Sequence, residues 1–106
     1  MQPNEMKQIV LDALDELKAI DVVVLNVSDL TYVTDFMVVC SGRASRHVKS
    51  IADNVVVKLK QAGVSPVKIE RDSKGEWILV DAGDVVVHVM MPQTRAFYQI
   101  EKLWEA

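Results

Sequence analysis

Four side chains that could do chemistry lie close together in the segment 76–91, which reads EWILVDAGDVVVHVMM. They are the indole of Trp77, the carboxylates of Asp81 and Asp84, and the imidazole of His88. Paired carboxylates can hold metal ions, a histidine can act as a base, and an exposed tryptophan can anchor a protein interface. Each residue also has an ordinary explanation, because aspartate favours turns and a lone histidine usually makes structural hydrogen bonds.

The two apolar runs of this segment predict a pair of strands around a tight turn. Both runs are short and rich in β-branched residues, and the tetrapeptide DAGD at 81–84 separates them. Alternation along each strand groups the side chains on shared faces, namely Trp77, Leu79 and Asp81 on the first strand and Val86, His88 and Met90 on the second. Trp77 then belongs either to the core or to an open sheet face, where it would be an interface anchor with Leu79.

Metal catalysis is the weaker explanation for Asp81 and Asp84. Two-metal chemistry needs carboxylates that converge on ions about 4 Å apart, usually with a third acid nearby. The turn by itself accounts for both residues. We therefore expect no metal and no cofactor at this position.

A second candidate site is the loop SGRASR at residues 41–46, which joins a predicted strand to a predicted helix. Free backbone N–H groups at a helix start could hold an anion, with Ser41, Gly42, Arg43, Ser45 and Arg46 around it. The glycine spacing matches neither a phosphate-binding P-loop nor a dinucleotide fingerprint. An ordinary turn capped by Ser45 is the alternative.

The single cysteine, Cys40, lies inside the apolar run FMVVC. A nucleophilic cysteine needs a base within hydrogen-bond reach, and spacing places neither His47 nor His88 beside it. The sequence therefore predicts a buried structural thiol. One cysteine also permits no internal disulfide, which fits a cytosolic protein.

Composition limits the classes of function. The chain has 106 residues and a net charge of −3, from 12 basic and 15 acidic residues. This length predicts one domain over residues 1–106, and the charge argues against a protein that mainly binds nucleic acid. The longest apolar runs are far too short to cross a membrane, and the start MQPNEMKQ does not resemble a secretory signal.

The spacing of apolar residues predicts the order α-β-β-α-β-β-β-α. Helices are expected from the cap Asn4 to about Ile20, from Ser45 to Ala62, and over 94–104 with Phe97, Ile100, Leu103 and Trp104 inward or partly inward. Strands are expected at 21–27, 36–40, 66–71, 77–80 and from 85 until Pro92, the first two buried. The helix between the second and third strands favours a parallel pair of these strands. Short turns at 72–75 and 81–84 favour antiparallel pairs, so we predict an α/β (α+β) fold with a mixed five-stranded sheet and packed helices.

Three motifs in order resemble one protein family over nearly the whole chain. The first is TDFMVVCSG at 34–42 followed by SRHV and IAD, the second is WILVD with GDVVVHV at 77–89, and the third combines Arg95, Phe97-Tyr98 and Leu103-Trp104. The family is the ribosomal silencing factors, also called the Iojap or YbeB family. Ala82 departs from the family, where bulkier residues are common, and the segment 70–76 is charged and irregular.

The resemblance implies a nucleotidyltransferase-like fold that lacks the acidic active site of those enzymes. It implies a non-enzymatic repressor that binds the large ribosomal subunit through its fourteenth protein and blocks joining of the small subunit when nutrients are short. The site it implies for that protein contains Trp77, Leu79, Asp81, Asp84, His88 and Tyr98. An acidic domain could dock on a basic ribosomal protein by charge complementarity, with little direct RNA contact.

Two alternatives stay open at this point. One is a nucleotidyltransferase-like enzyme or nucleotide-binding protein that uses Ser41, Gly42, Asp81 and Asp84. The other is a homodimer, formed off the ribosome through an exposed sheet edge.

Overall fold

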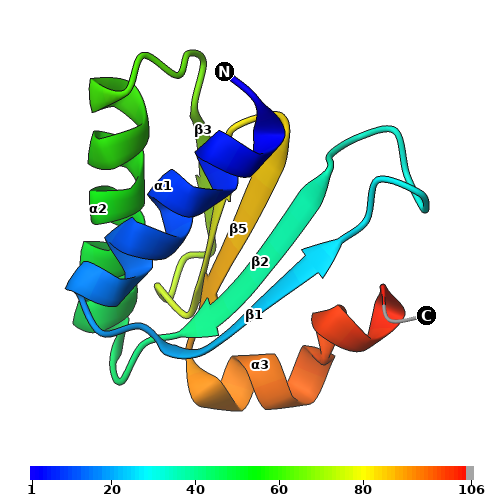
Figure 1. The fold of residues 1–106 in the computed structure, drawn as a ribbon. Helices are drawn as coiled ribbons and strands as arrows, with labels where there is room; N and C mark the ends of the chain where they lie inside the picture. Colours follow the sequence, from blue (N-terminus) through cyan, green and yellow to red (C-terminus); the bar gives the residue numbers. More distant parts are fainter. Residues whose placement is uncertain (105–106) are drawn as a thin grey trace.

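Three α-helices, one short 3-10 helix and five strands follow the predicted order in the computed structural model, which describes residues 1–104 (Figure 1). Their bounds are α1 Pro3–Glu16, β1 Ile20–Asn26, β2 Phe36–Ser41, α2 Ser45–Gln61, β3 Lys68–Arg71, β4 Trp77–Asp81, β5 Val85–Met90, α3 Pro92–Tyr98 and η1 Ile100–Leu103. Within these residues, no helix is both long and apolar enough to cross a membrane.

The five strands form one mixed sheet in the order β1-β2-β5-β4-β3. The turns at 72–75 and 81–84 join antiparallel pairs, as predicted. The expected parallel pairing of β2 with β3 is wrong, because β5 is the parallel neighbour of β2 and β3 lies at the far edge. The two short hairpins keep β3, β4 and β5 next to one another. After α2 the chain therefore enters the sheet at its far edge as β3, and β5 takes the position beside β2.

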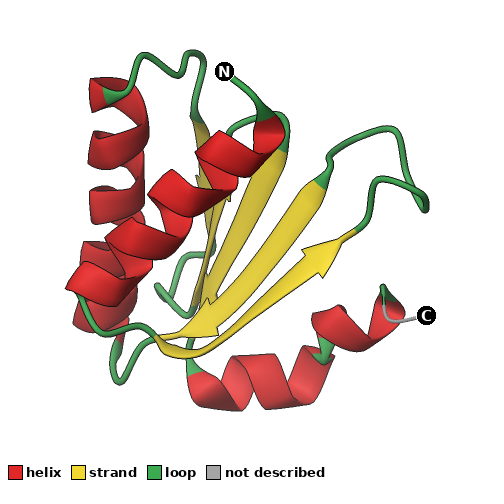
Figure 2. Ribbon diagram, viewed as in Figure 1, coloured by secondary structure: helices red, strands yellow, loops and turns green. Residues whose placement is uncertain are grey.

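The helices α1 and α2 pack on the same face of the sheet, where they cover the main hydrophobic core (Figure 2). On α2, the buried side chains recur every three or four residues, which is the period of one helix face. The helix includes the β-branched run 55–57, since packing of the apolar face outweighs local propensity. Strand β2 lies between β1 and β5, is buried over its whole length, and contributes side chains to this core.

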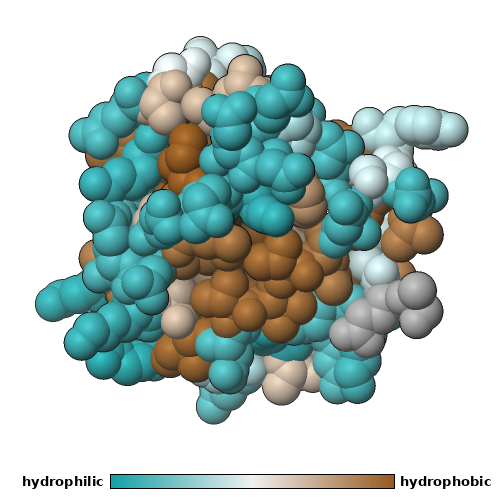
Figure 3. Space-filling view, viewed as in Figure 1, coloured by the Kyte–Doolittle hydropathy of each residue, from teal (hydrophilic) through white to brown (hydrophobic). Residues whose placement is uncertain are grey.

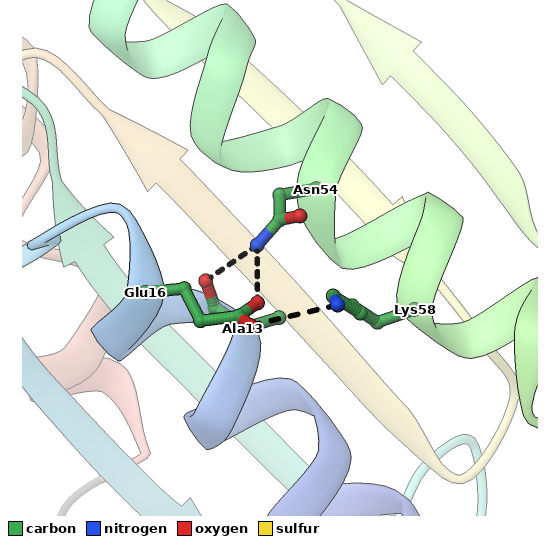
Figure 4. A network of polar contacts seen from close by, with 4 residues as sticks. All are labelled: Ala13, Glu16, Asn54 and Lys58. Carbon is green, nitrogen blue, oxygen red and sulfur yellow. Dashed lines mark hydrogen bonds and ion pairs between the residues drawn. The ribbon is translucent and has the colours of Figure 1, made fainter.

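A polar clasp holds α1 to α2 beside this core (Figure 4). The Asn54 side-chain amide donates one hydrogen bond to the Ala13 carbonyl oxygen at 2.9 Å and another to Glu16 Oε1 at 3.0 Å. The hydrogen bond from Asn54 to Glu16 is the main cause of a lowered pKa of the Glu16 carboxyl, and Lys58 at 3.5 Å adds to it. The clasp therefore ties the last turn of α1 to the middle of α2.

The strand β1 differs from the buried strand that the sequence predicts. It is an edge strand, and only some of its side chains are partly covered. Val22 is 39% and Val24 37% exposed, and Figure 3 shows hydrophobic surface gathered over β1 and β2, between α1 and α3. The run VVVL reads as buried from composition, but α1 and α2 cover only the other part of the sheet.

The closing helix is shorter than predicted and is broken. It begins at Pro92, ends at Tyr98, and is followed by η1 after Gln99, whose φ of 49° is left-handed. Ile100 is buried as expected, whereas Phe97 is 80% and Leu103 77% exposed, so their predicted inward positions are wrong. The prediction assumes one continuous helix over 94–104. The break at Gln99 changes the direction of the chain, so the helical period does not place these side chains correctly.

The predicted helix caps are also wrong in detail. The first two helices begin at Pro3 and Ser45, with Gln2 and Ala44 at the cap positions and no side-chain cap bond at either. Proline is well suited to the first helical turn, because its fixed φ is helical and its missing N–H would be unpaired there.

Candidate interaction site on the open face of the sheet

The face of the sheet opposite α1 and α2 carries the side chains that alternation groups together. The pairing of β4 with β5 sets three pairs of residues opposite each other, namely Trp77 and Met90, Leu79 and His88, and Asp81 and Val86. Directly paired residues in an antiparallel ladder point to the same face. The two predicted sets therefore form one surface, which we call the open face.

Only part of the open face is covered. A second hydrophobic cluster fills its β1–β2 side and contains Val27, Met37, Val39, Met90 and Ile100 of η1. Trp77 is packed against this cluster but is only half-buried. The sequence leaves Trp77 either in the core or on an open sheet face. In the structure, its side chain lies at the border between a small core and solvent.

Trp77 is part of a group of aromatic rings that includes residues far apart in the sequence. Its ring centroid lies 5.0 Å from that of Tyr98, and the centroid of Phe97 lies 4.9 Å from that of Tyr98. Phe97 and Tyr98 are largely exposed. We call Trp77, Phe97 and Tyr98 the aromatic patch.

His88 holds Trp77 of the aromatic patch in place through a hydrogen bond. Its Nδ1 accepts a hydrogen bond from the indole N–H of Trp77 at 3.0 Å, and its ring centroid is 5.8 Å from that of Trp77. Burial lowers the pKa of His88 to about 4, although the nearby Glu101 carboxylate opposes this change. The imidazole is therefore neutral near pH 7 and can keep its acceptor nitrogen.

A shallow groove of about 280 Å³ runs beside Trp77 on the open face. It is lined by Glu70, Arg71, Asp72, Trp77, Leu79 and His88. Its base is apolar and its rim carries charges, two of them carboxylates. Such an arrangement suits a protein partner that inserts a side chain with an apolar stem and a polar end.

The two turn aspartates have separate structural roles. The carboxylate of Asp81 accepts a hydrogen bond from the Gly83 N–H at 2.9 Å, and the main-chain carbonyl of Asp84 accepts from the N–H groups of Asp35 and Phe36. The Asp84 side chain is exposed. Residues 1–104 contain no group of three or more histidine, cysteine or acidic side chains that could hold a metal ion.

The loop 41–46 already uses several of the groups that an anion would need. The Gly42 N–H donates to the Met90 carbonyl oxygen at 3.1 Å, and the Arg43 N–H donates to His47 Nδ1 at 2.9 Å. Ser41 is buried, and its hydroxyl oxygen accepts from Arg95 at 3.2 Å. Arg43, Ser45 and Arg46 are exposed, and an anion site at this loop stays a prediction.

Cys40 is fully buried on the helix-covered face, as predicted. Burial raises the pKa of its thiol to about 12, and Arg95 only partly opposes this change. A thiol with such a pKa is protonated near neutral pH and is therefore a poor nucleophile.

Sequence reasoning overlooks several residues of this site. Glu70 faces Leu79 across the β3–β4 pair, and the register set by the turn at 72–75 is a signal that could have revealed it. Phe97 is predicted to be inward, but it lies in the aromatic patch. The contact of Tyr98 with Trp77 has no local signal, because it depends on the direction in which α3 leaves the sheet.

Comparisons with known proteins agree on one family. The family model described as "Ribosomal silencing factor during starvation" matches residues 1–106. A ribosomal silencing factor from Chromobacterium violaceum is 47% identical over 104 residues, which are 98% of this chain and 85% of that protein. A mouse protein named mitochondrial assembly of ribosomal large subunit protein 1 is 35% identical and covers 86% of this chain, which spans 41% of the mouse protein.

Solved structures have the same fold. A crystal structure of a protein from Chromobacterium violaceum has a TM-score of 0.94 at 47% identity, covering 98% of this chain and 87% of that one. A crystal structure from Bacillus halodurans has a TM-score of 0.85 at 35% identity, covering 95% of this chain and 94% of that one.

Proposed function

The chain belongs to the ribosomal silencing factor family, and from this premise we propose that it binds the large ribosomal subunit through the fourteenth protein of that subunit. The bound protein would occupy a surface that the small subunit needs, and would lower translation under nutrient limitation. The name of the mouse relative, which refers to assembly of the large ribosomal subunit, supports this choice of subunit. The proposed site of action is the cytoplasm.

The exposed aromatic patch is the observation that carries the proposal. Aromatic side chains are enriched among the residues that dominate binding energy at interfaces, where they act as anchors. Trp77 is held in place by His88 and Tyr98, so little conformational entropy is lost when a partner covers it. The groove beside it, with Leu79 and His88 in its lining, offers a concave surface for the partner.

The charge of the molecule favours a basic partner. The net charge is −3, and the open face or its rim carries Glu70, Asp72 and Asp81, with Asp84 in the adjoining turn. These carboxylates would attract a basic ribosomal protein and repel RNA phosphates, so little direct RNA contact is proposed. The mechanism is steric, and no covalent bond is made or broken.

A homodimer off the ribosome is part of the same proposal. The edge strand β1, with Val22 and Val24 exposed, supplies the sheet edge for it. Light scattering over a series of protein concentrations tests this part, because an edge-paired dimer dissociates on dilution.

Sedimentation of cell extracts through a density gradient tests the function. Extracts from starved cells should contain this protein in the large-subunit fraction and not in the small-subunit or joined-ribosome fractions. In a purified system, added protein should lower the amount of joined ribosomes in proportion to the large subunits that it occupies. If the protein stays at the top of the gradient, or binds without affecting joining, the proposal is wrong.

A thermal shift with nucleoside triphosphates and Mg²⁺ separates the binding protein from the enzyme alternative. A ligand at 100 times its dissociation constant stabilises a fold by about 2.7 kcal/mol. We expect no such stabilisation, and a shift of that size would instead favour a nucleotide-binding enzyme.

A further inference from the structure

The helix α3 carries two of the three rings of the aromatic patch but has little apolar packing against the rest of the molecule. None of its side chains is buried, and η1 contributes one buried side chain, Ile100. A hollow of about 460 Å³ lies between part of this segment and the sheet, and is lined by Asp21, Val23 and Ser41 on the sheet side. Apolar packing alone therefore leaves the position of α3 poorly determined.

Arg95 and Glu101, which both line this hollow, form an ion pair. The guanidinium of Arg95 on α3 contacts Oε2 of Glu101 on η1 through Nη2 at 2.8 Å and through Nε at 2.9 Å. Its remaining nitrogen, Nη1, donates to the Ser41 hydroxyl oxygen on β2 at 3.2 Å. One guanidinium thus joins three segments, across the left-handed turn at Gln99 that separates α3 from η1.

The pair is much less exposed to solvent than ordinary surface ion pairs. The side chains of Arg95 and Glu101 are only 13% and 16% exposed. Removing one partner would leave the other charge partly desolvated and unpaired, which is costly. By contrast, Lys49 and Asp53 on α2 form a pair at the same 2.8 Å with 60% and 50% exposure, where solvent screens the attraction.

We propose that Arg95 and Glu101 are positioning residues that form a latch, and that the latch holds Tyr98 against Trp77. This inference rests on the proposed function, because the latch would preorganise the aromatic patch for the ribosomal partner. Tyr98 lies one helical turn beyond Arg95, so fixing Arg95 to β2 fixes the distance of Tyr98 from the sheet. Neither latch residue needs to touch the partner.

The substitution Glu101→Gln tests the latch, with purified large ribosomal subunits as the probe. Residues that couple to a site without touching its ligand typically change affinity by roughly 2- to 30-fold, and we expect a loss in this range. The same substitution in a Tyr98→Ala background should cause no further loss, because the ring that the latch positions is absent. Asp53→Asn is the matched control and should bind like the parent.

A spectroscopic readout follows the geometry directly. The NMR resonance of the Trp77 indole N–H in the free protein reports the ring of Tyr98 beside it, and should shift in Glu101→Gln but not in Asp53→Asn. A charge-swapped variant with Arg95→Glu and Glu101→Arg should restore both the resonance and the affinity. Rescue of this kind is not expected if the pair only stabilises the chain end.

Several results would overturn the latch. These are an unchanged resonance with parental affinity in Glu101→Gln, an equal loss with and without Tyr98, or a folded charge-swapped variant that binds weakly. If Glu101→Gln does not fold, the charge-swapped variant alone decides between rescue and failure. If the parent itself does not bind large subunits, the proposed function fails, and the indole resonance still tests the latch.

Discussion

Trp77 donates its indole N–H to Nδ1 of His88 across the β4–β5 pair, with 3.0 Å between the two nitrogens. The residue directly opposite His88 is Leu79, so this bond runs diagonally along the open face. Because Nδ1 is the acceptor, the neutral ring carries its proton on Nε2. A proton on Nδ1 would face the indole N–H and abolish the bond, so the geometry of Trp77 depends on an uncharged His88.

We predict that His88 makes the stability of the protein depend on pH. Its pKa is lowered from 6.5 to about 4, so the unfolded chain binds a proton below pH 6.5 that the folded protein refuses until about pH 4. The contribution of uncharged His88 to the free energy of unfolding is therefore fully present above pH 6.5. The free energy of unfolding falls by up to about 3 kcal/mol as the pH decreases toward 4. Urea unfolding over this range should show a smaller decrease for His88→Gln, which keeps an acceptor but does not titrate. Equal decreases in both proteins would contradict the prediction.

Trp77→Ala should weaken binding to large ribosomal subunits while the protein stays folded. A central aromatic anchor commonly contributes about 2–4 kcal/mol, which corresponds to roughly 30- to 1,000-fold in affinity. The free energy of unfolding should change less than it would for a fully buried tryptophan, since Trp77 is only half-buried. Val57→Ala on the opposite, helix-covered side, where Val57 is 47% exposed, is the matched control. Parental binding by a folded Trp77→Ala variant would place the interface elsewhere.

Replacing Asp81 and Asp84 together by asparagine should slow association with the large subunit more than it speeds dissociation. Exposed charges mainly steer the encounter, and salt screens them. Asparagine at position 81 keeps an oxygen that can accept from the Gly83 N–H, so the turn should survive. Stopped-flow association measured at low and high salt checks this. The paired change Asp12→Asn with Asp53→Asn alters the net charge equally on the helices, and an equal effect there would rule out local steering.

Asn54→Ala should destabilise the fold by about 1–2 kcal/mol without changing ribosome binding. The substitution removes the partly buried hydrogen bond to the Ala13 carbonyl and the bond to Glu16, each of which contributes about 1 kcal/mol. Lys58→Ala breaks only the exposed pair with Glu16 at 3.5 Å, and should cost less than about 1 kcal/mol. Chemical denaturation ranks the two variants, and the reverse ranking would show that the clasp contributes through charge.

Gly42→Ala should cost about 1–3 kcal/mol, because the site has no room for a methyl group. A Cβ at this position would lie 2.8 Å from the Val48 main-chain nitrogen and 2.9 Å from Val48 Cγ2. Val48→Ala removes only the second contact, so the combined variant should not recover the stability lost at Gly42. Melting temperatures of the single and double variants decide this, and full recovery would show that the side-chain contact alone limits the space.

Local periodicity predicts much of the open face from the sequence. Alternation places Trp77 with Leu79 and His88 with Met90, and a tight turn at 81–84 makes the two strands neighbours. These features depend on residues close in the chain, so short-range geometry determines them. For the same reason the helix periods follow from the spacing of apolar residues, and the expected burial of Cys40 is confirmed.

Contacts between distant segments are decided only by the tertiary structure. Composition does not distinguish the exposed edge strand β1 from the buried β2, because both are apolar and only the limited width of the helix layer leaves β1 uncovered. The sequence determines that Trp77 and Tyr98 are aromatic residues on two elements. Their contact at 5.0 Å depends on the direction in which α3 leaves the sheet, which no local spacing in the sequence gives.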